Sequence, residues 1–364
     1  MDFKLDDEQQ MIVQTVRKFA ERDLRTWGPD ADRAGATPDR LVPAASELGF
    51  FIDAVPAGND GMLEGAYSHT TRALRGFELG RGCAAMAALL ETNVEPALAV
   101  EKWGTSNAKQ ALFGSLASGG LATLFHDSRG TLELVAEGDG YRVTGKLGPA
   151  PALAGASHVL VVAREAVFLI ATDGVKREAI TPSGWRAAKW ATAQLEAKQV
   201  HGWNVLARGD QAKAIGHEIL AWARVSLAAR AAGVATAAME FAKAYADERV
   251  QFGQKIGAFE SLIRLRDDAE TAALGAKLYA LHAAWAIDTN QPNAFDLASR
   301  ARVAAGDAVT RATIDAVQIF GGYGFVNDYP VEKLMRDARA FEALLGDERL
   351  GRVLAEKTVI AGGN

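Results

Sequence analysis

A stretch of alternating and β-branched residues lies in the middle of this 364-residue chain, between two long regions of helical periodicity. Runs such as "TLELVAEGDGYRVTG", "SHVLVVA" and "AVFLIATDGV" fall between Leu121 and Val205, and Gly, Asp and Pro separate them. Such runs predict strands joined by turns, and the Asp139-Gly140 pair predicts a hairpin. On both sides of this stretch, apolar residues recur at the spacing of a buried helix face.

This order predicts an α+β fold that is mainly α, divided into three domains. We expect an N-terminal helical bundle over residues 1–120, a small middle β-domain over 121–210, and a C-terminal four-helix bundle over 211–364. The length is consistent with two or three domains of roughly 100 to 200 residues each. Stretches rich in Ala and Leu in the last region favour close packing of helices, within the chain or against a second chain, unless they reflect a biased genome.

Charge and cysteine content exclude several functional classes. The formal net charge is -5 with acids and bases interleaved, and no basic stripe is present, so we do not expect a nucleic-acid partner. The single cysteine, Cys83, lies in the apolar "GRGCAAMAALL" and is interpreted as a buried structural thiol. The amphipathic N-terminus resembles neither a signal peptide nor a membrane span, so we expect a cytoplasmic protein that does not bind membranes. We assign no metal site.

Two C-terminal segments carry a specific family signal. "YADERVQFGQKIGAFE" is similar to the pattern R-x-x-F-G-x-x-I-x-x-F-Q, and "AVQIFGGYGFVNDYPVEKLMRDAR" is similar to Q-x-x-G-G-x-G-[YF]-x-x-[ED]-[YF]-P-V-E-[RK]-x-x-R-D-A. Weaker matches are "SELGFF", "FELGR" and "KWGTSNAKQALFGSLASGG". Along essentially its whole length, the chain therefore resembles the acyl-CoA dehydrogenase family.

The resemblance implies that this chain contacts FAD. In the family, the corresponding residues reach across a dimer interface to the pyrophosphate and adenosine end of FAD in the neighbouring subunit. The implied contacts here are Arg249, Gln251, Phe252, Gln318, Gly321 and Gly322. A guanidinium offers a fixed fork of donors to pyrophosphate, and adjacent glycines let the backbone approach a ligand closely. The structural alternatives are that Arg249 forms a surface ion pair and that "GGYG" is only a turn that ends a helix.

The family's catalytic glutamate is missing at both of its known places. This base removes the α-proton of the acyl-CoA thioester while a hydride leaves for the flavin. At the family's spacing after Arg336, the usual position is Leu345, and the alternative position, directly before Arg224, is Ala223. Glu342 and Glu348 lie nearby, but each is about one helical turn away, and we interpret both as surface charges. We therefore assign no catalytic residue.

The middle region departs from the family in the same direction. Where members carry T-E-P-x-[AG]-G-S-D and W/F-[IV]-[TS]-N around the flavin ring, this chain has "TLFHDSRGT" and "KLGPAPALAGASH". His126 and Asp127 occupy the first segment, and we interpret them as polar loop residues and not as a catalytic couple. The chain thus keeps the residues that would contact a neighbour's FAD, and it lacks the residues that would hold its own flavin ring.

This division resembles the heteromeric acyl-CoA dehydrogenases of bacterial steroid and branched-acid catabolism. We expect a non-catalytic subunit of a heterotetramer that shares FAD with a paralogous subunit carrying the glutamate, acting on bulky acyl-CoA thioesters such as steroid side chains. The implied electron acceptor is an electron-transferring flavoprotein. One alternative is a homo-oligomeric flavoenzyme with other chemistry, such as desulfination. The other is a flavin-free acyl-CoA-binding or scaffold protein.

Overall fold

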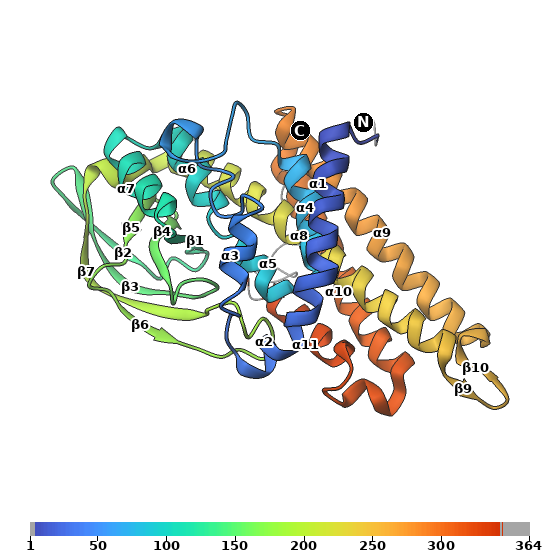
Figure 1. The fold of residues 1–364 in the computed structure, drawn as a ribbon. Coiled ribbons are helices and arrows are strands. Elements are labelled where there is room, and N and C mark those ends of the chain that lie inside the picture. Colours follow the sequence, from blue (N-terminus) through green and yellow to red (C-terminus); the bar gives the residue numbers. More distant parts are fainter. Residues whose placement is uncertain (1–3, 343, 345–364) are drawn as a thin grey trace, which may run out of the picture.

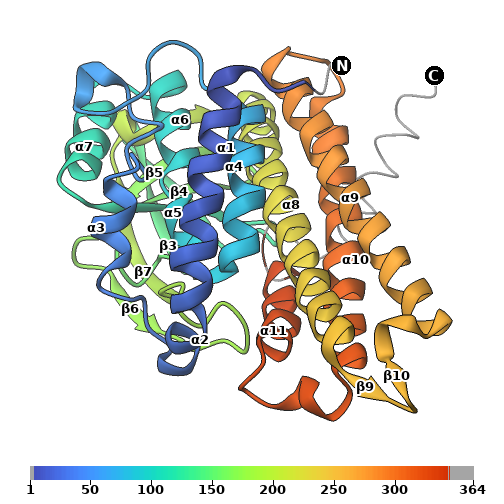
Figure 2. The same ribbon diagram turned by 45° about the vertical axis from the view of Figure 1, so that its right-hand side comes forward.

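Long helices and a pair of small sheets occupy opposite sides of the molecule (Figure 1). The structure is a computed structural model, and it describes residues 4–342 and 344. Helices before and after the sheets combine into one body, since α4 (His69–Gly82) and α8 (Gly209–Glu248) pack side by side (Figure 2). This agrees with the predicted fold, which is mainly helical with a small β-domain in the middle.

Short helices build the N-terminal part. They are α1 (Asp7–Phe19), the π-helical turn η1 (Ala20–Leu24), α2 (Arg25–Ala34), α3 (Leu41–Ser46), η2 (Ala57–Asn59), α4 (His69–Gly82), α5 (Ala84–Leu90), α6 (Val94–Trp103) and α7 (Ser106–Ala117). The first helix begins with a capping box, in which Asp6 accepts from the backbone N–H of Gln9 at 2.7 Å and the Gln9 side chain accepts from that of Asp6. Thr105 caps α7 by accepting from the N–H of Ala108.

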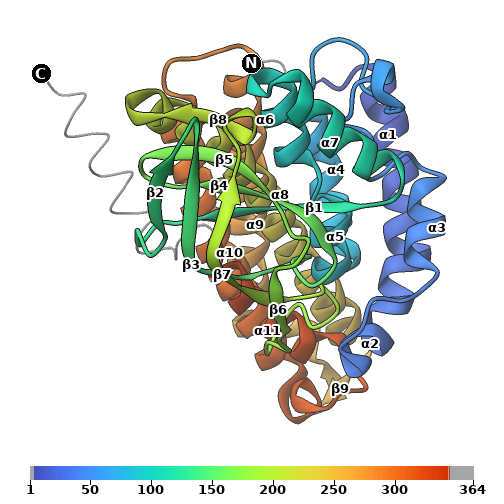
Figure 3. The same cartoon turned by 90° about the vertical axis from the view of Figure 1, so that its left-hand side faces the viewer.

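Two four-stranded sheets form the middle part. One has the order β1-β4-β5-β8 and the other β2-β3-β7-β6 (Figure 3). The strands are β1 (Leu121–His126), β2 (Glu133–Glu137), β3 (Gly140–Ala150), β4 (Ala156–Val162), β5 (Ala166–Ala171), β6 (Lys176–Ala179), β7 (Ala191–Val200) and β8 (Val205–Arg208), with η3 (Gly202–Asn204) before the last.

The alternation of side chains along β4 explains why the first sheet is buried on both faces. Val159 and Val161 join an apolar core shared with the second sheet, whereas Leu160 and Val162 join another core with the helices α6 and α7. Successive side chains on a strand point to opposite faces, so an uninterrupted apolar run fits a sheet covered on both sides.

The predicted hairpin is present, but its turn lies one residue earlier than expected. β2 and β3 pair so that Glu137 faces Gly140, which leaves Gly138 and Asp139 as the turn. Gly138 has a φ of 59°, the left-handed backbone that a tight hairpin turn requires at its first central position. Asp139-Gly140 therefore marks the hairpin without itself forming the turn.

The C-terminal part consists of long helices and a small hairpin. They are α8 (Gly209–Glu248), β9 (Val250–Gln251), β10 (Gln254–Lys255), η4 (Ile256–Ala258), α9 (Glu260–Asp288), α10 (Ala294–Phe320), η5 (Gly321–Phe325) and α11 (Pro330–Glu342). Small residues allow α8 to pack closely on α4. A Cβ on Gly80 would lie 2.2 Å from the Arg230 carbonyl oxygen, and one on Gly233 would lie 2.1 Å from that of Phe77. Larger residues at either glycine would push the two helices apart.

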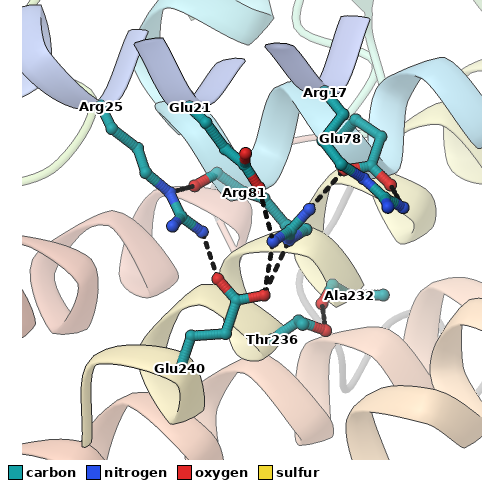
Figure 4. Close-up of polar contacts among 8 residues, drawn as sticks. All are labelled: Arg17, Glu21, Arg25, Glu78, Arg81, Ala232, Thr236 and Glu240. Carbon is teal, nitrogen blue, oxygen red and sulfur yellow. Dashed lines mark hydrogen bonds and ion pairs between the residues drawn. The ribbon is translucent and has the colours of Figure 1, made fainter. Parts of the chain in front are cut away.

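A network of ion pairs joins the first helices to α8 (Figure 4). Glu240 of α8 pairs with Arg25 and Arg81, and Arg81 also pairs with Glu78 at 2.6 Å. Glu78, whose side chain is only 1% exposed, pairs with Arg17 at 2.8 Å. Because each buried carboxylate has a guanidinium partner, the network can be buried without leaving an uncompensated charge.

Cys83 is a buried free thiol at the junction of α4 and α5, as predicted, with the Lys333 Nζ 3.7 Å from its sulfur. Among the helices that the structure describes, none is both long and apolar enough to cross a bilayer.

Candidate functional site

The residues predicted to contact FAD line a single groove at the end of the C-terminal helices. The groove has a volume of about 540 Å³ and lies between the end of α8 and the end of α10. Its lining comprises Tyr245, Arg249, Gln251, Phe252, Ile256, Phe259, Leu262, Gln318, Ile319, Phe320, Gly321, Gly322, Tyr323 and Val326. The structure thus brings together two sequence segments that lie far apart along the chain.

The hairpin β9–β10 fixes one wall of this groove. Arg249 ends α8, with its N–H donating to the carbonyl of Tyr245 at 2.9 Å, and its own carbonyl accepts from Ile256 at 2.8 Å. The turn residues Phe252 and Gly253 both have positive φ, 52° and 79°, as a two-residue hairpin turn of type I′ requires. This turn leaves the Phe252 side chain 92% exposed.

The turn after α10 fixes the opposite wall. Gly321 has φ 58° and ψ -134°, a conformation open essentially to glycine alone, and its N–H donates to the carbonyl of Gln318. The Tyr245 ring stacks on Phe320 with centroids 4.2 Å apart, which packs the two helix ends together. Gln318 and Gly322 are exposed at this wall. Side-chain amide, backbone and aromatic groups are therefore all accessible to a ligand.

Arg249 is the cation of the groove. Its guanidinium carbon lies 5.4 Å from the centre of the Tyr323 ring, and it forms no ion pair with a carboxylate of residues 4–342. The first structural alternative from the sequence, a surface ion pair, is therefore not what the described residues form. A cation without an acidic partner, beside an exposed aromatic ring and flexible polar groups, suits a ligand that is both anionic and aromatic.

A second, much smaller cavity lies between the sheets and α8. Its volume is about 70 Å³. The lining residues are Ala88, Glu91, Thr92, Glu95, Thr123, Leu124, Pro151, Trp185, Ala223, Leu227, Arg230 and Leu344. Pockets for organic ligands and cofactors usually measure about 300 to 1,000 Å³, so this cavity is too small for a flavin ring or an acyl chain.

Buried charges that the sequence analysis missed surround the small cavity. Glu91 pairs with Arg72 and Arg75, each at 2.6 Å, and Glu95 pairs with Arg72 at 2.8 Å. Burial alone would raise the pKa of Glu91, but Arg75 and Arg72 outweigh burial and lower this pKa to about 2. A carboxylate held so strongly in its charged form is a weak base. A sequence signal existed, since Glu91 and Glu95 interrupt an otherwise apolar helical stretch.

His126 and Asp127 do not act together. Both Asp127 oxygens accept backbone N–H groups, from Thr131 at 2.8 Å and Leu132 at 3.0 Å, and hold the loop before β2. Burial, followed by the nearby Arg224, lowers the pKa of His126 to about 4. No hydrogen bond links the two side chains within residues 4–342, so Asp127 serves the loop and the pair is not a catalytic couple.

Comparison with known proteins identifies the family. The family model described as "Acyl-CoA dehydrogenase, N-terminal domain" matches residues 6–120, and "Acyl-CoA dehydrogenase, C-terminal domain" matches residues 212–358. The "probable acyl-CoA dehydrogenase YngJ" of Bacillus subtilis is 30% identical over 389 aligned positions, which cover 99% of this chain and 100% of that protein. The chain belongs to the acyl-CoA dehydrogenase family.

Solved structures agree with this assignment. A chain in the structure described as "Electron transferring flavoprotein of Acidaminococcus fermentans" is 27% identical, with a TM-score of 0.89 and 99% of both chains covered. Butyryl-CoA dehydrogenase from Megasphaera elsdenii has the same TM-score at 24% identity, over 99% of this chain and 100% of that chain, and shows the likeness of the fold.

Of the two positions that hold the base in acyl-CoA dehydrogenases, the one at Ala223 lies within the described residues. Ala223 lies in α8, is buried and lines the small cavity, so this position itself provides no carboxylate. Leu345 and Glu348 lie outside the described residues, as does the side chain of Glu342, the last residue of α11. In the part of the chain that the structure describes, no cluster of at least three His, Cys, Asp or Glu could hold a metal ion.

Proposed function

We propose that this chain is the non-catalytic subunit of a heteromeric, FAD-dependent acyl-CoA dehydrogenase. In this proposal it shares one FAD with a paralogous subunit that carries the catalytic glutamate. The observation that carries the proposal is a contrast between the two sites of the chain. The groove at the end of α8 and α10 is open and measures about 540 Å³, whereas the cavity between α8 and the sheets measures only about 70 Å³.

The open groove suits the pyrophosphate and adenosine end of FAD. Arg249 offers a guanidinium without an acidic partner among residues 4–342, and charge-assisted bonds to phosphate are the strong ones. Gln251, Gln318 and the backbone at Gly321 and Gly322 offer polar contacts, and Phe252 offers an exposed ring. A large aromatic side chain that is 92% exposed is better accommodated under a ligand or a second chain than in water.

The small cavity explains why the chain needs a partner. Trp185 and the paired carboxylates Glu91 and Glu95 line the space beside Ala223, so no acyl chain can lie there without moving buried charges. Although apolar residues such as Leu124 and Leu227 also line this space, it is too small to bury an acyl chain, and hydrophobic burial is what drives the binding of such a chain. FAD, when bound, would accept the hydride of the substrate, and the partner's glutamate would take the proton.

The names of related proteins support a substrate class and an electron acceptor for this proposal. The printed names of related proteins include short-chain specific acyl-CoA dehydrogenases, which supports an acyl-CoA thioester as the substrate class. We propose bulky acyl groups, such as steroid side chains, because a site shared by two unlike chains can be wider than one within a single chain. A structure named for an electron-transferring flavoprotein contains a similar chain, which supports such a protein as electron acceptor.

The decisive experiment is a count of flavin. We expect this chain, co-purified with a paralogous acyl-CoA dehydrogenase encoded beside it, to contain one FAD per pair of unlike chains. Purified alone, it should contain little FAD. Two FAD per unlike pair would contradict the proposal. Complete loading of the chain alone would favour a homo-oligomeric flavoenzyme with other chemistry, and a stable but colourless protein in both preparations would favour a scaffold.

A further inference from the structure

A third cavity, of about 320 Å³, lies where the start of α1, the start of α4 and the end of α9 meet (Figure 2). Leu74 of α4 and Leu281 and Trp285 of α9 form its apolar part. None of its lining residues belongs to the groove at Arg249 or to the cavity beside Ala223. Pockets for small organic ligands begin at about 300 Å³, so this cavity is a separate candidate site of sufficient size.

One end of this cavity is acidic. Asp288 accepts from the backbone N–H groups of His69 at 2.7 Å and Thr70 at 2.8 Å, and so caps the first turn of α4. Asp6, the cap of α1, also lines this end, together with Lys4. The two carboxylates outnumber the cation, and like charges repel. A ligand with a carboxylate should therefore direct it toward the opposite end.

The opposite end carries a cation without an acidic partner. Lys277 lies one helical turn before Leu281 on α9, and Phe77 lies nearly one turn after Leu74 on α4. The Nζ of Lys277 is 4.0 Å from the centre of the Phe77 ring, which places the amine beside the apolar part of the cavity. Lys277 is half-buried and forms no hydrogen bond or ion pair with another described residue.

Glu78, the carboxylate that acts on Lys277, is bound by other cations. Its Oε1 pairs with Arg17 at 2.8 Å and its Oε2 with Arg81 at 2.6 Å. Burial lowers the pKa of Lys277, Glu78 opposes this effect, and Arg17 and Arg81 add to it. An anion bound beside Lys277 would supply negative charge where positive charge is in excess, and it would favour the ammonium form.

We propose that this cavity binds a medium-chain fatty carboxylate, whose chain lies on Leu74, Leu281 and Trp285 and whose carboxylate accepts from the Nζ of Lys277. Lys277 and Trp285 are separated by roughly 12 Å along α9, a span that an extended chain of about eight carbons fills. Hydrolysis of an acyl-CoA thioester yields an acid of this kind, so the ligand is chemically related to the proposed substrate. The site depends neither on FAD nor on a partner subunit.

The test is calorimetric titration of the full-length chain with sodium octanoate below its micelle-forming concentration, with sodium chloride at equal ionic strength as the blank. We expect saturable binding at one site per chain, with a dissociation constant between about 0.1 and 1 mM. Each CH₂ group that leaves water strengthens binding by up to about fourfold, so affinity should rise from butanoate through hexanoate to octanoate. Octanamide keeps the chain but loses the charge, and should bind roughly tenfold more weakly.

Two substitutions, each with a matched control, assign the site. Lys277→Met keeps an unbranched side chain and removes the charge, so it should weaken octanoate binding roughly tenfold. Lys243→Met, at an exposed lysine of α8, should bind like the wild type. Leu281→Gln makes the apolar part polar at similar size and should weaken binding roughly fivefold. Ile314→Gln, at an exposed residue of α10 outside the cavity, should have no effect.

The melting temperature shows whether each variant is folded, and in the wild type it should rise with octanoate, because a ligand that binds only the folded state stabilises it. The absence of saturable heat with the wild type would overturn the inference, since the cavity would then hold only solvent. If Lys277→Met binds octanoate as the wild type does and Lys4→Met binds it more weakly, the carboxylate lies at the other end and the assignment is wrong. If Ile314→Gln weakens binding as much as Leu281→Gln, octanoate only adsorbs to exposed apolar surface.

Discussion

The guanidinium carbon of Arg249 lies 5.4 Å from the centre of the Tyr323 ring, which joins the end of α8 to the turn that follows α10. No acidic side chain among residues 4–342 forms an ion pair with this guanidinium. Its N–H groups point in the plane and remain available for a bidentate contact with an anion such as a phosphate. Two segments that are distant in sequence thereby form one recognition surface, and the surface depends on a single positive charge.

Replacing this charge should release FAD from the complex with the partner subunit. Arg249→Ala removes charge-assisted bonds worth about 1.5 to 3 kcal/mol each, so we expect cofactor affinity to fall roughly 10 to 150-fold. The measurement is the ratio of flavin to protein absorbance after dialysis. Arg264→Ala on α9, where Arg264 pairs with Glu260 at the surface, is the matched control and should retain its flavin.

The partner subunit supplies the complementary test. Its arginine at the matching position would face the small cavity side of this chain, where we propose that no flavin ring binds. Its loss should therefore leave the flavin content nearly unchanged. A complex that keeps all of its FAD in Arg249→Ala, or loses it equally in both variants, would contradict a single shared site.

The chain alone should not dehydrogenate any saturated acyl-CoA. Ala223 provides no carboxylate at one base position, and Leu345 provides none at the other. Assays of purified chain with a dye acceptor and a series of acyl-CoA thioesters should give no turnover above the blank. Leu345→Glu should not create activity, because the cavity beside Ala223 is too small for the substrate. Turnover by the unpaired wild-type chain would refute this prediction.

The sequence predicted those local features that depend only on residues close together in the chain. Thr105 could be recognised as a helix cap, and the apolar run of β4 as a strand, because both depend on neighbouring residues. The convergence of Arg249 and Gln318 was predicted from the family patterns and could not have come from periodicity. The hairpin turn was displaced by one residue because both glycines, Gly138 and Gly140, are compatible with a turn and only the strand register selects between them.

The small cavity could not be predicted from the sequence. Its charges come from α4, from the residue after α5, from α6 and from α8, and helical periodicity describes only one helix at a time. In the sequence, Arg72, Glu91 and Arg230 lie in separate helical stretches and show no sign of lying close together. Only the tertiary structure shows that Arg72 pairs with Glu91 and Glu95, while Arg230 has no direct acidic partner among the described residues.

The ion-pair network of Figure 4 should be energetically uneven. Glu78 is almost fully buried between Arg17 and Arg81, so Glu78→Gln should reduce the free energy of unfolding by roughly 2 to 3 kcal/mol. Glu21 also pairs with Arg81 but is 45% exposed, and Glu21→Gln should cost less than about 1 kcal/mol. Urea unfolding at pH 7 measures both values. Equal effects would show that burial does not determine the strength of these pairs.

His69 should make the folded chain sensitive to mild acid. The residue is 7% exposed, its ring lies 5.4 Å from that of Tyr67 and 5.5 Å from that of Trp222, and its Nδ1 has no partner among the described residues. Burial, followed by the charges of Arg72 and Lys102, lowers the pKa of His69 to about 3. Asp288 accepts from the His69 backbone N–H at 2.7 Å but does not offset this effect.

The sign of the pH dependence follows from this lowered pKa. The unfolded chain binds a proton at His69 below about pH 6.5, whereas the folded chain does so only near pH 3, so stability falls as the pH decreases between these values. The slope is about 1.4 kcal/mol per pH unit, so His69 should account for a loss of about 2 kcal/mol between pH 6.5 and pH 5.

His69→Phe keeps the ring stack and removes the titration. In urea unfolding at pH 7 and pH 5, this variant should lose about 2 kcal/mol less than the wild type on acidification, while the exposed His201→Phe should behave like the wild type. An unchanged pH dependence in His69→Phe would mean that His69 is protonated in the folded protein and that its stacked site tolerates the charge.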